Sequence, residues 1–337
     1  MFKLYLIIAS GTIISCLLFY LFNLEENYIV SKPLLLFIRF INVFFHPIAF
    51  ITPALILMKS HNTQIIKISA YFIFTAILGM QTSYFAALYV AQNSLQKLCK
   101  IFLFASIFMT IVLILSAPFL KTFQKKPIAS NYFIETKPQK IVLALLIGCV
   151  FNTGLRYHYF FIDRHVTEVL VIKGDSTFGY IFFYFTLGIS LLFAAYFFKQ
   201  KNQQKFLSNA LAGILLLSII SIILPIYSLI NYAIYQIIFA FFLSTFLVPS
   251  LSLIFLMFKN SQLIFHGTMW FSTGYALGNL ASDWLTEKYG FYTQYNYLPM
   301  LPLVFGSSGC LLMLSYLRDR LNVLSDSKTH SNNKSNL

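Results

Sequence analysis

The sequence predicts an all-α membrane protein, with about ten transmembrane helices in two pseudo-symmetric bundles of four and six helices. The composition is the first reason: 58% of the 337 residues are hydrophobic and 10% are charged, too few for the surface of a soluble protein. The second is that ten apolar runs could each cross a ~30 Å hydrocarbon core, without the alternation typical of membrane strands. The third is a long internal repeat.

The repeat has two copies that lie about 196 to 199 residues apart. The first copy runs through Pro53 and a polar loop at 62–64 to an apolar run ending near Ala87. The second runs through Pro249 and a polar loop at 260–262 to Ser282. Repeats of this length in a membrane chain are typical of secondary transporters.

The ten apolar runs define the predicted helices in order. They lie near residues 4–22, 33–58, 66–91, 101–120, 141–170, 176–198, 206–228, 230–258, 262–282 and 296–317. The first run resembles a signal peptide with Cys16 at a lipoprotein-like cleavage site, but its length and the runs behind it favour a transmembrane helix. The run 141–170 turns polar in its second half, so its helix either continues or ends near Leu155.

The charges indicate the orientation. With the N-terminus in the cytoplasm, 16 Lys and Arg lie on the cytoplasmic side and seven on the other, while the acids divide three to seven in the opposite sense. This bias predicts a multi-pass protein of a bacterial-type inner membrane with both termini in the cytoplasm. The net charge of +14 therefore reflects topology, and no basic cluster indicates nucleic-acid binding.

Four segments follow from this pattern. Residues 1–120 form an incomplete N-terminal bundle of four helices, 121–140 a basic cytoplasmic linker, 141–317 a six-helix bundle, and 318–337 a polar cytoplasmic tail. The end of the tail, Ser325–Leu337, is predicted to be disordered. If the halves are equivalent, the first bundle lacks two helices that would precede residue 1.

Three motifs carry a family resemblance. Leu35–Asn42 with Arg39 is similar to an Arg-x-x-Gln-Gly helix pattern, and Lys173–Gly179 is similar to a Gly-x-Ser-x-x-x-Gly helix entry. Gly274–Gly278 resembles a late helix of the same family, the major facilitator superfamily. The resemblance spans the chain, although the family's Gly-x-x-x-Asp-Arg-x-Gly-Arg-Lys loop is absent. It implies two bundles around a central cavity, lined here by the runs 33–58, 141–170 and 230–258, and transport by alternating access.

One polar face is predicted on the second run. Arg39, Asn42 and His46 lie at i, i+3 and i+7, so they share a helix face. A cation inside the membrane costs about 2.5–3.5 kcal/mol on insertion scales, which favours a wet cavity. The alternatives are that Arg39 extends to the membrane surface and that His46 is a buried core residue.

A second polar stripe lies on the run 141–170. It consists of Asn152, Arg156, Tyr159 and Asp163, with His158 on a neighbouring face. It either lines an outer vestibule or belongs to a solvated loop beyond the helix end.

Small residues mark two further helices. Gly79, Ser83 and Ala87 are spaced at i, i+4 and i+8, as are Gly274, Gly278 and Ser282. This spacing allows helices to approach closely in lipid. The two helices either slide against each other between the bundles or pack statically.

The expected function is transport of a small solute by a monomer in the lipid bilayer, with no cofactor and no metal. The acids lie in loops or at the ends of runs, so His46 and His158 are the candidate groups for proton coupling. The cysteines, Cys16, Cys99, Cys149 and Cys310, form no CxxC pair. Phosphate-loop, Ser/His/Asp and zinc motifs are absent. Two alternatives are an integral-membrane acyltransferase using Arg39 and His46, and an inactive transporter remnant.

Overall fold

The computed structural model describes residues 64–91, 138–157, 177–198, 202–223, 229–258, 261–289 and 300–333, with isolated positions within 10–58 and 104–115. These residues form helices and contain no strand, in agreement with the predicted all-α class. Three stretches, Pro138–Arg156, Gln203–Ser221 and Ala233–Met257, are long and apolar enough to cross a membrane. The chain is therefore a helical membrane protein.

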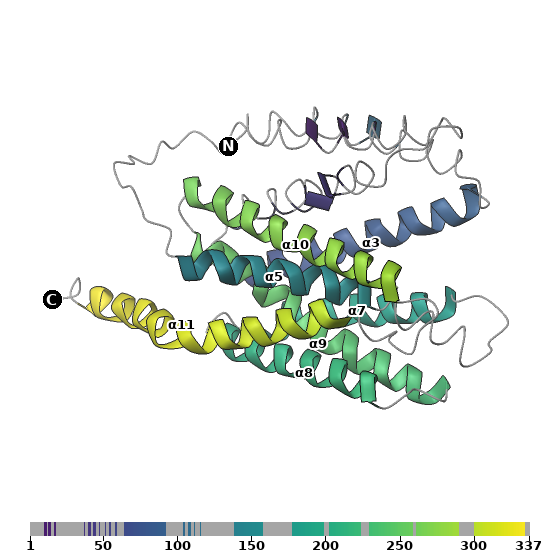
Figure 1. Ribbon diagram of the computed structural model, residues 1–337. Coiled ribbons are helices and arrows are strands. Elements are labelled where there is room, and N and C mark those ends of the chain that lie inside the picture. Colours follow the sequence, from purple (N-terminus) through teal and green to yellow (C-terminus); the bar gives the residue numbers. More distant parts are fainter. Residues whose placement is uncertain are drawn as a thin grey trace.

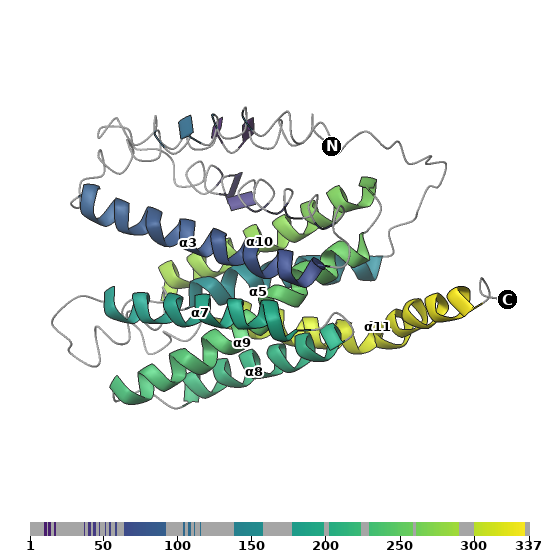
Figure 2. The same cartoon turned by 180° about the vertical axis from the view of Figure 1, so that it is seen from behind.

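Seven helices lie in the continuously described residues, and each overlaps one of the predicted runs (Figures 1 and 2). They are α3 (Ile65–Ala91), α5 (Pro138–Tyr157), α7 (Thr177–Phe197), α8 (Gln203–Ile223), α9 (Leu229–Met257), α10 (Ser261–Tyr289) and α11 (Leu301–Asn333). The predicted runs 4–22, 33–58 and 101–120 lie outside these continuous stretches.

A proline lies at one of the observed helix ends. α5 begins at Pro138, inside the segment predicted as a linker, and proline suits the first position of a helix. α8 is described as far as Ile223, and residues 224–228 of its predicted run lie outside the described residues. α5 ends at Tyr157, and residues 158–170 of its predicted run lie outside the described residues.

Two helices are longer than their apolar runs. α10 continues from Ser282 to Tyr289, and α11 continues to Asn333. The prediction of disorder from Ser325 is therefore wrong as far as Asn333. Residues 310–333 contain no glycine or proline, so nothing in the backbone stops a helix that is already formed. The far end of α11 projects beyond the other helices (Figure 1).

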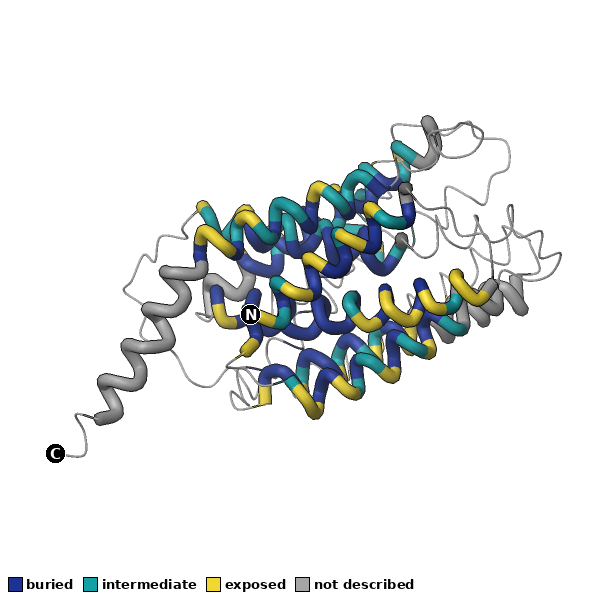
Figure 3. Tube along the Cα trace, turned by 90° about the horizontal axis from the view of Figure 1, so that it is seen from below, coloured by how far each residue is buried: buried dark blue, intermediate teal, exposed yellow. Residues whose placement is uncertain are grey.

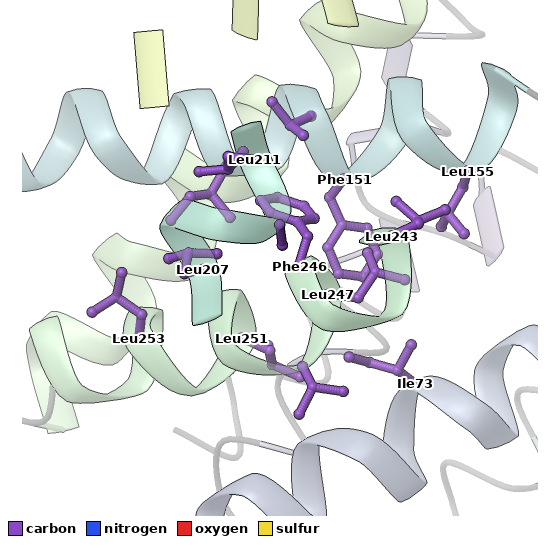
Figure 4. Packing of buried hydrophobic residues seen from close by; sticks show 14 of the residues in the cluster. Ile73, Phe151, Leu155, Leu207, Leu211, Leu243, Phe246, Leu247, Leu251 and Leu253 are labelled. Carbon is purple, nitrogen blue, oxygen red and sulfur yellow. The ribbon is translucent and has the colours of Figure 1, made fainter. Parts of the chain in front are cut away.

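α9 is the central helix of the bundle, where it contacts α3, α5, α7, α8 and α10. Its Phe239, Phe246 and Leu243 are fully buried. Figure 4 shows this core from close by, with side chains of α5, α8 and α3 turned toward those of α9. Exposed residues follow the outward faces of the helices (Figure 3), and many are large and apolar, as a lipid-facing surface requires.

Pro249 lies inside α9, eight residues before its end at Met257, and has no N–H to donate to the preceding turn. Its own carbonyl accepts a hydrogen bond from Nε2 of Gln203 on α8 at 2.9 Å. The hydroxyls of Ser250 and Ser252 are buried and donate to carbonyls of α9. At the end of α9, Nζ of Lys140 donates to the Met257 carbonyl at 3.3 Å, which connects α9 with the start of α5.

α3 joins the predicted N-terminal bundle to the C-terminal one. It packs against α7 and α9. The hydroxyls of Tyr71 on α3 and Tyr196 on α7 are hydrogen-bonded at 3.2 Å. A Cβ atom at Gly188 of α7 would lie 3.2 Å from the ring of Phe74. The two predicted bundles are thus in direct contact through α3 and α7.

Candidate functional site

Glycines bring α5 and α10 into backbone contact, and this pair of helices carries the candidate site. A Cβ atom at Gly148 of α5 would overlap the carbonyl of Phe271 on α10. One at Gly274 of α10 would overlap the carbonyl of Leu145 on α5. In apolar surroundings small residues allow helix backbones to approach closely, so this seam holds the two helices in one register.

An ion pair lies beside the seam. Nη2 of Arg156 on α5 donates to Oδ1 of Asp283 on α10 at 2.8 Å, and Nη1 donates to Oδ1 of Asn279. Nδ2 of Asn279 donates to Oδ2 of Asp283 at 2.9 Å. The three side chains therefore form a closed ring, which we call the triad. Both ends of the guanidinium and both carboxylate oxygens are engaged in it.

The triad is largely withdrawn from solvent. The side chains of Arg156 and Asp283 are 19% and 11% exposed, and Asn279 is buried. An isolated charge in such a place is strongly disfavoured, but a hydrogen-bonded pair of opposite charges brings no net charge into the bundle. Removal of either partner would leave an uncompensated charge, so the two side chains depend on each other.

Asn152 extends the site by one helical turn. It lies four residues before Arg156 on α5, which places it on the same face as Arg156 and Gly148. Its side chain is 1% exposed and within hydrogen-bonding reach of Tyr275 on α10. Its Oδ1 atom accepts no hydrogen bond. A buried acceptor without a donor is uncommon and is a position where a ligand can bind.

The remaining predicted polar residues are not tested by this geometry. Arg39, Asn42 and His46 lie outside the described residues, as do His158, Tyr159 and Asp163. Asn152 and Arg156 are therefore the members of the two predicted polar faces that the structure describes.

The two predicted stripes of small residues lie in different surroundings. Gly274 and Gly278 face α5, where a Cβ atom at Gly278 would be 3.0 Å from Sγ of Cys149; Ser282 is buried. Gly79 is on the exposed side of α3, with no atom within 4 Å of an added Cβ. Ser83 and Ala87 lie on α3, but their side chains are outside the described residues. α10 thus packs on α5, a helix of the same predicted bundle.

Asp283 and Asn279 are functional candidates that the sequence analysis missed. The apolar run ends at Ser282, which predicts that Asp283 lies at the end of a span, whereas Asp283 lies inside α10, six residues before Tyr289. An available signal was the i, i+4 spacing of Asn279 and Asp283, together with the need of Arg156 for an opposite charge. Within the described residues no group of three or more His, Cys, Asp or Glu side chains could hold a metal ion.

No protein-family model matches the chain, and no curated protein matches it. The candidate site is therefore defined by its own geometry: a buried, charge-neutral triad between two helices, with an unused acceptor one turn away.

Proposed function

We propose that the chain is a secondary active transporter of the major facilitator type, which moves a small solute across a bacterial-type inner membrane by alternating access. The observation that carries this proposal is the Arg156–Asp283 ion pair, which lies on two helices of a mostly apolar bundle. Charged side chains are rare in membrane helices, and where they occur they mark substrate and ion pathways.

The arrangement of the helices supports the same proposal. α9 is a central, continuous helix that contains Pro249 and carries several buried hydroxyls. Proline is more frequent in transmembrane helices than in the helices of soluble proteins. α3 contacts α7 and α9, as expected where two bundles move against each other. We propose ten spans in total, in bundles at 1–120 and 141–317.

The proposed orientation determines on which side of the membrane the site lies. With both termini in the cytoplasm, α5 and α10 both run outward, as the distribution of Lys and Arg supports. Arg156 and Asp283 are then in the outer half of the membrane, near the ends of their helices. A solute arriving from outside would meet these polar groups first.

The test is transport by the purified protein in proteoliposomes. Labelled glucose, glycerol, L-lactate, inorganic phosphate and spermidine are offered outside vesicles preloaded with the same unlabelled compound. We expect at least one compound to exchange, and Arg156→Gln to abolish the exchange. Thr153→Val is the matched control, since this buried hydroxyl donates to the Cys149 carbonyl of its own helix. Exchange of none of these compounds above empty vesicles would count against the proposal.

A further inference from the structure

We infer that the triad and Asn152 form a binding site for a small carboxylate that carries a hydroxyl group, and that this anion is transported together with one proton. The inference rests on the proposed transport function and specifies its substrate class and its coupling. It is carried by the Arg156–Asp283 contact and by the unused acceptor of Asn152.

The triad already contains a carboxylate, which is the group that an arginine in a binding site would bind. The planar fork of a guanidinium suits a carboxylate, and here the carboxylate of Asp283 occupies one side of the fork. A carboxylate from a solute fits the same position because it has the same shape and charge. Solute and Asp283 therefore compete for Arg156.

This competition couples the solute to a proton. While Asp283 is ionised, the triad is neutral, and a bound anion would bring an unpaired negative charge into a site that is largely buried. A proton taken up from the outer water by the Asp283 carboxylate removes that charge and releases Nη2 of Arg156. The solute anion then pairs with Arg156, and the site is neutral again. One proton and one monovalent anion cross together, without net charge movement.

Among the helices that the structure describes, α5, α9 and α11 pack against α10. α5 contributes Arg156 and, at its opposite end, Lys140. α9 and the part of α11 up to Leu317 contribute tyrosines but no charged side chain. On α10 itself, Glu287 and Lys288 follow Asp283 by about one turn, Tyr275 is two turns before it, and His266 lies near the other end of the helix. Arg156 is the charged side chain that the structure places in direct contact with Asp283.

Asn152 narrows the substrate class. Its free Oδ1 is one turn from Arg156, about 6 Å along the helix axis, which is the length of a three- or four-carbon acid. A buried acceptor binds a solute that supplies an O–H donor and discriminates against one that does not. L-Lactate has the carboxylate and the hydroxyl, whereas propanoate has the carboxylate alone.

The experiment compares these two probes in proteoliposomes, with the membrane potential clamped by potassium and valinomycin. An outer pH below the inner pH is expected to drive accumulation of lactate, and a change of the clamped potential is expected to leave it unaltered. After subtraction of the passive uptake by empty vesicles, protein-dependent uptake of lactate should exceed that of propanoate by about tenfold. The Asn152→Leu variant should lose this preference, and Thr153→Val should keep it.

Variants at Asp283 test the coupling. Asp283→Asn imitates the protonated state, so it should still exchange lactate between the two sides but should lose accumulation driven by the pH gradient. Asp283→Glu keeps an ionisable partner for Arg156 and should retain that accumulation. The comparison of the two variants shows whether a loss of accumulation comes from lost proton coupling or from a misfolded protein.

Three results, each measured above empty vesicles, would overturn the inference: lactate uptake that does not respond to the pH gradient, driven accumulation by Asp283→Asn, or equal uptake of lactate and propanoate. Exchange of glucose or glycerol without any uptake of lactate would also overturn it, while it would support the proposed transport function. Exchange of no compound at all would count against both.

Discussion

Gly274 of α10 lies directly against the carbonyl oxygen of Leu145 on α5, so close that a Cβ atom would overlap it. Gly148 and Phe271 form the reciprocal contact from the other helix. These contacts set the register in which Arg156 meets Asp283, because the two helices cannot slide past each other without a clash. The seam therefore determines the geometry of the candidate site.

We predict that Gly274→Ala destabilises the protein by at least about 2 kcal/mol, since a methyl group here meets backbone and cannot be accommodated by a side-chain movement. Intrinsic fluorescence can follow thermal unfolding in detergent, because both tryptophans of the chain, Trp270 and Trp284, are on α10. The apparent melting temperature of the variant should fall clearly below that of the parent protein.

Gly79→Ala is the matched control. No atom lies within 4 Å of a Cβ atom at this position, so the substitution should be neutral or should stabilise by up to about 1 kcal/mol through helix propensity. A loss at Gly79 equal to that at Gly274 would show that the α5–α10 seam is not the cause.

The seam also predicts a new disulfide. A Cβ atom at Gly278 would be 3.0 Å from Sγ of Cys149, and 3.1 Å and 3.2 Å from its carbonyl oxygen and Cα, so the two sulfurs can bond if the helices move apart slightly. Gly278→Cys should therefore form an α5–α10 crosslink under mild oxidation. Mass spectrometry of proteolytic fragments with and without reductant would detect it. Gly79→Cys is the control, and recovery of the Gly278→Cys fragments as free thiols would contradict the observed register.

Hydropathy predicted where the helices lie but not where all of them end. An apolar run stops where the lipid-facing residues stop, whereas backbone hydrogen bonding continues into polar sequence, as it does in α10 after Ser282 and in α11 after Leu317. The repeat and the charge bias are patterns of the whole chain, made by residues on both sides of the linker. They indicate bundles and orientation, but they do not determine which helices touch.

The candidate site was partly predictable for a similar reason. Arg156 stands out because a charge on an apolar helix is rare. Its partners Asn279 and Asp283 are 123 and 127 residues away, and no periodicity links residues on different helices. The spacing of Gly274 and Gly278 indicates a close contact, and Ala144 and Gly148 have the same i, i+4 spacing on α5, but the spacing alone does not say which two helices meet.

The ion pair should show strong coupling in a double-mutant cycle. We expect Arg156→Met and Asp283→Leu each to cost about 2–3 kcal/mol, less than for a fully buried pair because both side chains keep some exposure. The double variant removes both charges, so it should cost less than the sum by about 1–3 kcal/mol. Apparent melting temperatures of the four proteins give the cycle. Additive losses would show that the two side chains act independently.

Two buried glutamines should respond in opposite directions to the same substitution. Gln236 of α9 is fully buried, and neither atom of its amide has a hydrogen-bond partner. Gln203 of α8 is also buried, but its Nε2 donates to the Pro249 carbonyl at 2.9 Å. A buried amide without partners costs about 1–3 kcal/mol, whereas the Nε2 hydrogen bond of Gln203 contributes about 1 kcal/mol, although its Oε1 has no partner. Gln236→Leu should therefore raise the apparent melting temperature, and Gln203→Leu should lower it.

The same pair separates stability from transport. A stabilising Gln236→Leu variant that loses exchange of a transported compound would identify the amide as a solute contact, kept at the expense of stability. A stabilising variant with full exchange would identify it as a packing position only. If Gln236→Leu destabilises the protein as much as Gln203→Leu does, then the amide of Gln236 has a stabilising partner in the membrane, and its unpaired state in the bundle is contradicted.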